Sequence, residues 1–135
     1  MTVKSLDHVN IIAEDLDATA RFYGDLLDLK RGEIPGMASG NVGGFQGAWL
    51  LDRADRAIIH LMAWNADRHA GLERGSATGS IDHVALACED FAGTLARCEA
   101  LGVEHRVNDR KYGDLRQVFV RDPNNVMLEL NFAGE

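Results

Sequence analysis

The sequence contains few cysteines and few prolines: two of each among 135 residues. Cys88 and Cys98 stand ten residues apart, a spacing that fits no zinc-knuckle motif. We therefore expect both thiols to be small, partly buried core residues rather than a disulfide. The low proline content and the lack of low-complexity stretches are typical of a globular protein, and the length suits one domain rather than two independent ones.

Basic runs and long apolar runs are also absent. No run of lysine and arginine exceeds two residues, and 21 acidic residues outnumber 14 basic ones. Nucleic acids and anionic membranes bind basic stripes, so we expect neither as a partner. No segment approaches the length of an apolar membrane span, and the first residues lack the apolar core of a secretion signal. We therefore expect a cytoplasmic location.

What the sequence does contain is an internal repeat. Residues 6–19 read LDHVNIIAEDLDAT, and residues 81–94 read IDHVALACEDFAGT. Six of the 14 aligned positions are identical, including an Asp-His-Val tripeptide and a Glu-Asp pair. Because the period is close to half of the chain, the repeat predicts one duplicated module and not a solenoid array.

Each copy predicts the same order of elements, βαβββ. The strands are expected at about 6–13, 28–33, 45–51 and 56–62, and again at about 81–88, 103–108, 115–121 and 126–132. The modules then cover about 4–62 and 81–133, and the small and polar residues of 63–80 link them. A four-stranded sheet with one helix cannot bury both of its faces alone, so we expect the modules to pair in a single α+β domain over 1–135.

The Glu-Asp pair precedes a predicted amphipathic helix in each module. Asp15 and Asp90 are placed to cap the first turn, and Gly102 is placed to end the second helix. Helical spacing predicts the apolar faces. They comprise Leu16, Ala20, Tyr23 and Leu27 in the first helix, and Phe91, Leu95, Cys98 and Leu101 in the second.

Four side chains of the kinds that bind metal ions stand at matched places in the two modules. His8 and His83 occupy the same position in each first strand, and His60 and Glu129 lie centrally in each last strand. Alternate residues of a strand share a face of the sheet. If the modules pair about a pseudo-two-fold axis, these four side chains converge.

Three imidazoles and one carboxylate are a suitable ligand set for a divalent ion. Imidazole binds iron, zinc, copper and nickel, and the carboxylate adds manganese and cobalt. The absence of a thiolate disfavours a structural zinc site. Four protein ligands on an octahedral ion leave two positions for a bidentate substrate. A single histidine in a strand is more often a core or surface residue, but the symmetry of the four favours a joint site.

These residues lie in motifs that resemble the vicinal oxygen chelate superfamily, which includes glyoxalase I, extradiol dioxygenases, and fosfomycin-resistance and bleomycin-binding proteins. The motifs are LDHV at 6–9, AIIHLM at 57–62, IDHVAL at 81–86 and VFVRDPNNVMLELNF at 118–132. The last is similar to the family's D-P-[DN]-G-N-x-[IL]-E-[IL] ending, with Asn125 in place of the usual glycine. The resemblance spans essentially the whole chain. It implies two βαβββ modules that form a U-shaped sheet around a divalent metal ion, often within a dimer.

The resemblance also implies roles for individual residues. One divalent ion (nickel, cobalt, zinc, manganese or iron) is bound by His8, His60, His83 and Glu129, and Glu129 is the expected catalytic proton shuttle. A small-molecule substrate then lies in a funnel lined by Asn10, Met62, Ala85, Gln117, Phe119, Met127 and Asn131, with Trp49 as either an aromatic wall or a core residue. We expect a homodimer, because each curved sheet leaves an edge and an apolar face to cover.

The resemblance leaves three classes of function open. The first is a metal-dependent isomerase or lyase of the glyoxalase type, although glyoxalase I has a glutamate at the position of His60. The second is an extradiol dioxygenase with iron on His8, His83 and Glu129. The third is a non-catalytic binding or antibiotic-resistance protein, against which four intact ligands argue. Fosfomycin resistance fits less well, because those enzymes have a tyrosine where this chain has Phe119.

Two loops and one further histidine complete the expectations. The stretch GMASGNVGG at 36–44 lacks the Lys-Ser/Thr ending of a phosphate loop, so we expect a flexible loop. The stretch around Lys111 and Tyr112 is either a loop that clamps an anionic substrate or a solvated turn. His69 is expected at the surface.

Overall fold

The computed structural model describes residues 2–34, 46–73, 78–108 and 114–134. The loops predicted at 36–44 and around Lys111 and Tyr112 lie outside these ranges. The chain divides into two compact units, Met1–Glu73 and Arg74–Glu135. Each unit holds one copy of the repeat. Residues 63–73, which we expected to belong to the linker, are part of the first unit.

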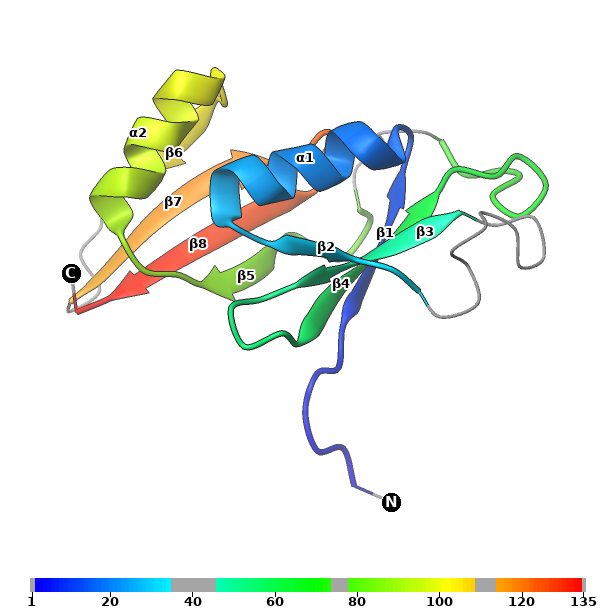
Figure 1. Cartoon of the computed structure of the whole chain (residues 1–135), viewed down its shortest axis with the longest axis horizontal. Helices are drawn as coiled ribbons and strands as arrows, with labels where there is room; N and C mark the ends of the chain where they lie inside the picture. Colours follow the sequence, from blue (N-terminus) through cyan, green and yellow to red (C-terminus); the bar gives the residue numbers. More distant parts are fainter. Residues whose placement is uncertain (1, 35–45, 74–77, 109–113, 135) are drawn as a thin grey trace. The chain divides into compact units, whose positions relative to one another are not determined.

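The first unit is a four-stranded sheet with one helix (Figure 1). Its elements are β1 (Val9–Ala13), α1 (Leu16–Leu27), β2 (Lys30–Gly32), β3 (Gly47–Leu51) and β4 (Ala57–Ala63). The strand order is β1-β4-β3-β2, with β1 parallel to β4 and the other neighbours antiparallel. The first and last strands of the module are therefore direct neighbours.

The second unit repeats this arrangement. Its elements are β5 (Val84–Ala87), α2 (Phe91–Leu101), β6 (His105–Val107), β7 (Leu115–Arg121) and β8 (Met127–Ala133). The order β5-β8-β7-β6, with β5 parallel to β8, matches the first sheet strand for strand. The predicted α+β fold of two tandem βαβββ modules is confirmed.

One face of each sheet packs against its helix and forms the core. In the first unit the alternate residues Ile59 and Leu61 of β4 are at most 1% exposed, and Tyr23 of α1 is fully buried. In the second unit Leu128 and Leu130 of β8 are fully buried. Because successive strand residues point to opposite faces, His60 and Glu129 lie on the faces that their helices leave free.

The predicted helix caps are confirmed. The Asp15 side chain accepts a hydrogen bond from Ala18 N at 2.8 Å, and Asp90 accepts one from Gly93 N at 3.0 Å. Gly102 ends α2 in the left-handed conformation, with φ 65°. Leu101 was wrongly assigned to the buried face of α2: it is 47% exposed, because Thr94 packs inward with Phe91 and Cys98.

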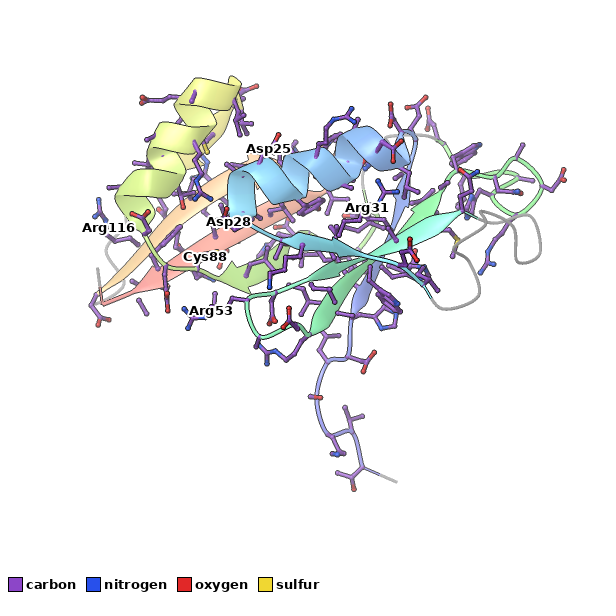
Figure 2. The ribbon with its side chains drawn as sticks, viewed as in Figure 1. Asp25, Asp28, Arg31, Arg53, Cys88 and Arg116 are labelled. Atoms are coloured by element: carbon purple, nitrogen blue, oxygen red, sulfur yellow. The ribbon has the colours of Figure 1, made fainter. Side chains whose placement is uncertain are left out.

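The cysteines and one arginine contact belong to the core of the second unit. Cys88 and Cys98 are both free, and Cys98 is buried. Cys88 follows β5 (Figure 2), and burial raises the pKa of its thiol to about 11. Arg116 of β7 places its guanidinium carbon 3.4 Å from the ring centroid of Phe91 at the start of α2.

Neither helix in the described part of the chain is long and apolar enough to cross a membrane.

Candidate metal centre

His8 immediately precedes β1 and is held by its neighbour in the sequence. Its Nδ1 lies 2.6 Å from Asp7 Oδ2, so that Nε2 remains available to bind a metal ion. The imidazole meets the indole of Trp49 edge-on at a centroid distance of 5.0 Å, and it lies 6.1 Å from the ring of His60. Trp49 is itself 4.7 Å from the His60 ring. The predicted ligands of the first unit therefore lie together, with Trp49 against both.

His60 occupies the centre of β4, between Asn10 of β1 and Trp49 of β3 in the sheet register. Asn10 Nδ2 lies 2.8 Å from His60 Nδ1. His60 Nε2 is the one buried side-chain nitrogen or oxygen of the described residues that has no hydrogen-bond partner. A Cβ at Gly47 would lie 3.2 Å from this atom, so the glycine leaves space beside it.

The environment of His60 favours its neutral form. Burial lowers the pKa of His60 from its usual 6.5, and the nearby His8 and Arg68 lower it further. Neutral imidazole is the form that binds metal ions. If the Asn10 amide is turned by 180°, its carbonyl oxygen accepts a hydrogen bond from His60 Nδ1–H. His60 Nε2 then carries no proton, and its lone pair is available to a metal ion.

The second unit holds a histidine–carboxylate pair. His83 precedes β5, and its Nδ1 lies 2.8 Å from Asp82 Oδ2, as His8 pairs with Asp7. His83 Nε2 is 3.3 Å from Glu129 Oε2 on β8. The hydrogen bond to Asp82 raises the pKa of His83 above 6.5, and the charge of Glu129 contributes in the same direction. The remaining ring nitrogen of His83 thus faces the carboxylate predicted to be its fellow ligand.

Glu129 is embedded in a network of amide side chains. Its Oε1 accepts hydrogen bonds from Gln117 Nε2 at 3.0 Å and from Asn131 Nδ2 at 2.8 Å. Asn108 Nδ2 in turn donates to Gln117 Oε1 at 2.7 Å. Across the face, the ring of Phe119 lies 6.5 Å from that of His83 and beneath the guanidinium of Arg106. Glu129 therefore has one oxygen engaged by amides and one directed to His83.

The residues present fit a divalent ion as two half-sites. The donor set is imidazole nitrogen and carboxylate oxygen, and His60 Nε2 is a buried nitrogen that an ion would satisfy. Among the described residues no three His, Cys, Asp or Glu side chains gather closely enough to form a complete site. Each unit instead supplies one pair: His8 with His60, and His83 with Glu129.

The residues predicted to line a funnel lie on the same faces as the predicted ligands. Register places Asn10, Trp49 and Met62 on the His60 face, and Gln117, Phe119, Met127 and Asn131 on the Glu129 face. Asp7, Asp82 and Asn108 were not predicted to take part. The repeated Asp-His dipeptide was the available signal for the two aspartates, because histidine ligands commonly donate their second N–H to a carboxylate.

His69 was predicted at the surface, and this is wrong. It is 5% exposed, and its ring lies 5.2 Å from that of Trp64. Its Nδ1 accepts a hydrogen bond from Asn65 N at 3.0 Å, so the side chain closes the turn that follows β4. His69 is a structural residue of the first unit.

A hollow of about 750 Å³ lies elsewhere in the first unit. Its walls include Asp17 at the start of α1, Arg31 of β2, Ala63 at the end of β4 and Trp64 directly after it. Asp17 and Arg31 form an ion pair there at 2.6 Å, and Figure 2 shows Arg31 on β2. Neither His8 nor His60 lines this hollow, although Gly47, the neighbour of His60 Nε2, does.

Comparison with known proteins identifies the family. The family model for the Glyoxalase/Bleomycin resistance protein/Dioxygenase superfamily matches residues 5–130. The chain belongs to this family. Among curated proteins, Glyoxylase I 4 of Arabidopsis thaliana is 27% identical over 129 residues, which cover 93% of this chain and 69% of that protein. The resemblance expected from the motifs is thereby confirmed.

Solved structures of the superfamily share the fold. A variant of the fosfomycin resistance protein FosX from Listeria monocytogenes, in complex with manganese(II) and a dihydroxypropylphosphonic acid, gives a TM-score of 0.73 at 20% identity, covering 98% of this chain and 94% of that one. A glyoxylase/bleomycin resistance protein/dioxygenase domain from Frankia sp. EAN1pec gives 0.73 at 19% identity, with 99% and 95% covered. These likenesses concern architecture, and the reaction must be argued from the residues.

Proposed function

We propose that this superfamily member is a divalent-metal-dependent enzyme of the glyoxalase type, an isomerase or lyase. Its substrate is a small molecule that carries two neighbouring oxygens. The observation that supports the proposal is the repetition of ligand positions. In each unit an aspartate-oriented histidine precedes the first strand, and a potential ligand occupies the same place in the last strand. A manganese(II) complex of a structural relative is in keeping with a divalent ion.

In this proposal His8, His60, His83 and Glu129 hold the ion. Once bound, the ion supplies positive charge that stabilises negative charge developing on the substrate oxygens. Asp7 and Asp82 keep His8 and His83 oriented with Nε2 outward. Glu129 Oε2, the oxygen that no amide engages, is the atom we assign to binding and to the movement of a substrate proton. Trp49 and Phe119 provide apolar walls that keep water from the reacting atoms.

Proton transfer next to a carbonyl has a direct test. The protein is loaded separately with Ni²⁺, Co²⁺, Zn²⁺ and Mn²⁺ and incubated in D₂O with small 2-hydroxyketones and thiohemiacetals of 2-oxoaldehydes. The proposal predicts metal-dependent incorporation of deuterium at the carbon beside the carbonyl, detected by NMR, and its loss in Glu129→Gln. No exchange with any of these ions, although metal binds, would reject the isomerase.

The same residues also suit iron, so the dioxygenase is the rival outcome. Two imidazoles and one carboxylate form the ligand set of non-haem iron(II) oxygenases. Oxygen uptake with a catechol and Fe²⁺, together with no deuterium exchange, would establish a dioxygenase instead of an isomerase. Tight small-molecule binding that survives metal removal would indicate a binding protein. The homodimer and the cytoplasmic location remain predictions from the sequence.

A further inference from the structure

Glu129 is held on only one of its two oxygens. Oε1 accepts hydrogen bonds from two amide groups, those of Gln117 and Asn131, at 3.0 and 2.8 Å. Oε2 receives neither, and it lies 3.3 Å from His83 Nε2. The side chain of Glu129 is 15% exposed, so little water competes with these contacts. The two oxygens therefore differ in their contacts: Oε1 accepts hydrogen bonds from amides, and Oε2 faces His83.

The orientation of Gln117 is itself fixed. Asn108 Nδ2 donates to Gln117 Oε1 at 2.7 Å, and Asn108 N donates to Gln117 O at 3.1 Å. Both N–H groups of the Gln117 amide are used, one on Glu129 Oε1 and one on Asn131 Oδ1 at 2.9 Å. Turning this amide would set its carbonyl oxygen against the carboxylate and lose the bond from Asn108. Gln117, at 9% exposed, thus has little capacity left for a substrate.

The first unit lacks this network at the same positions. Gly47 pairs with Met62 in the first sheet as Gln117 pairs with Asn131 in the second. In the first sheet the residue that pairs with both the aromatic residue and the first strand is His60, an imidazole and not a carboxylate. An imidazole needs no pair of amide donors, whereas a part-buried carboxylate does. The amides therefore accompany the carboxylate and are not a general requirement of the fold.

We propose that Gln117 and Asn131 are positioning residues that occupy Oε1 and so present Glu129 to the metal ion through Oε2 alone. This inference rests on the proposed metal site. In this role Gln117 and Asn131 orient a metal ligand and do not contact the substrate. Loss of a hydrogen-bonding partner to a metal ligand typically weakens metal affinity by about 10- to 100-fold.

The experiment measures binding of Co²⁺ alone, by calorimetry and by the visible absorption of the ion. Gln117→Met keeps the length of the side chain and removes its amide. We expect an affinity weaker by about 10- to 100-fold, because Glu129 loses one of the two amides that orient it. The Co²⁺ spectrum should change as well, because the carboxylate is then less firmly oriented toward the ion. Gln46→Met, the same change on an exposed side chain of the first unit, is expected to match wild type.

A double-mutant cycle separates positioning from general damage to the fold. In a Glu129→Ala background, Gln117→Met should weaken Co²⁺ binding no further, because its effect passes through the carboxylate. Asn131→Ala, on the same half-buried face of β8 as Glu129, provides a second variant should Gln117→Met fail to fold. One outcome rejects the positioning role but not the metal site. In it, wild type binds Co²⁺ and His83→Ala does not, while both amide variants retain wild-type affinity and spectrum. If wild type and His83→Ala both fail to bind, the metal site itself is rejected.

Discussion

His60 and Glu129 occupy the same position in the two sheets. Each is the fourth-strand residue paired with an aromatic side chain on one neighbour, Trp49 or Phe119. On the other neighbour each pairs with the second residue of a first strand, Asn10 or Ala85. Duplication has thus placed two different side chains, each a proposed metal ligand, at one structural position. The groups around them differ to suit an imidazole in one unit and a carboxylate in the other.

The space beside His60 gives a prediction on stability. A Cβ at Gly47 would lie 2.8 Å from Leu61 O and 3.1 Å from Ile34 Cδ1, as well as against His60. Backbone cannot yield cheaply at such a distance, so we expect Gly47→Ala to lower the free energy of unfolding by about 1–3 kcal/mol. Urea denaturation followed by circular dichroism measures this. A wild-type midpoint would mean that no close packing exists there.

Gly24→Ala is the matched control for that change. Gly24 lies within α1, and a Cβ there would meet only Leu29 O at an ordinary 3.5 Å. Alanine is the better helix former, so this variant should be more stable than wild type by about 0.5–1 kcal/mol. The two glycine substitutions are therefore expected to shift the urea midpoint in opposite directions.

His60 and His83, two of the proposed ligands, have different surroundings and should titrate on opposite sides of 6.5. Burial lowers the pKa of His60, whereas the hydrogen bond that His83 Nδ1–H donates to Asp82 raises that of His83. NMR of the imidazole nitrogens in metal-free protein, assigned with single His→Gln variants, measures both. Asp82→Asn should bring the pKa of His83 down and leave His60 unchanged. The reverse order of the two histidines would contradict the described environments.

The same shifts set the direction of the pH dependence of folding. For His60 the unfolded chain binds more protons in the window just below pH 6.5, so its contribution to stability falls as the pH drops through that window. For His83 the stabilisation is complete below pH 6.5 and is lost as the pH rises through the raised folded-state pKa. Comparison of His60→Gln and His83→Gln with wild type across this range should show these opposite slopes.

Trp49 offers an optical report on the first half-site. Its ring centroid lies 5.0 Å from His8 and 4.7 Å from His60, so an ion bound by these rings would be close to the indole. In a Trp64→Phe variant, Trp49 is the only tryptophan that remains. We expect Co²⁺ to quench its fluorescence saturably, and Zn²⁺, which has a filled d shell, to compete without equal quenching. Saturable quenching that persists in His60→Ala would place the ion elsewhere.

The sequence was sufficient to predict the modules and the faces of the sheets on which the proposed ligands lie. The repeated Asp-His-Val segment predicted the duplication, and residue alternation placed His60 and Glu129 opposite the core. Strand ends were less predictable: residues 28–33 form only β2 at Lys30–Gly32, and residues 103–108 only β6 at His105–Val107. Edge strands end where backbone pairing ends, and the hydrophobic pattern does not reveal this point.

The amide network could not be predicted from alternation alone. Gln117 was expected on the ligand face, and it lies there, but its contacts depend on the register of β7 against β8. The Asp122–Val126 turn fixes that register, with Arg121 opposite Met127 and therefore Gln117 opposite Asn131. A count outward from the turn would have paired them. The orphaned Nε2 of His60 depends on side-chain packing and had no signal in the sequence.

In the proposed function, one divalent ion is held by His8, His60, His83 and Glu129. The most direct test is elemental analysis of protein purified without chelators and then reconstituted, in wild type, His60→Ala and His83→Ala. We expect one ion per chain in wild type and substantially less in both variants, each of which removes a proposed ligand from one unit. Wild-type protein that stays metal-free after reconstitution, or variants that keep the full wild-type content, would contradict it.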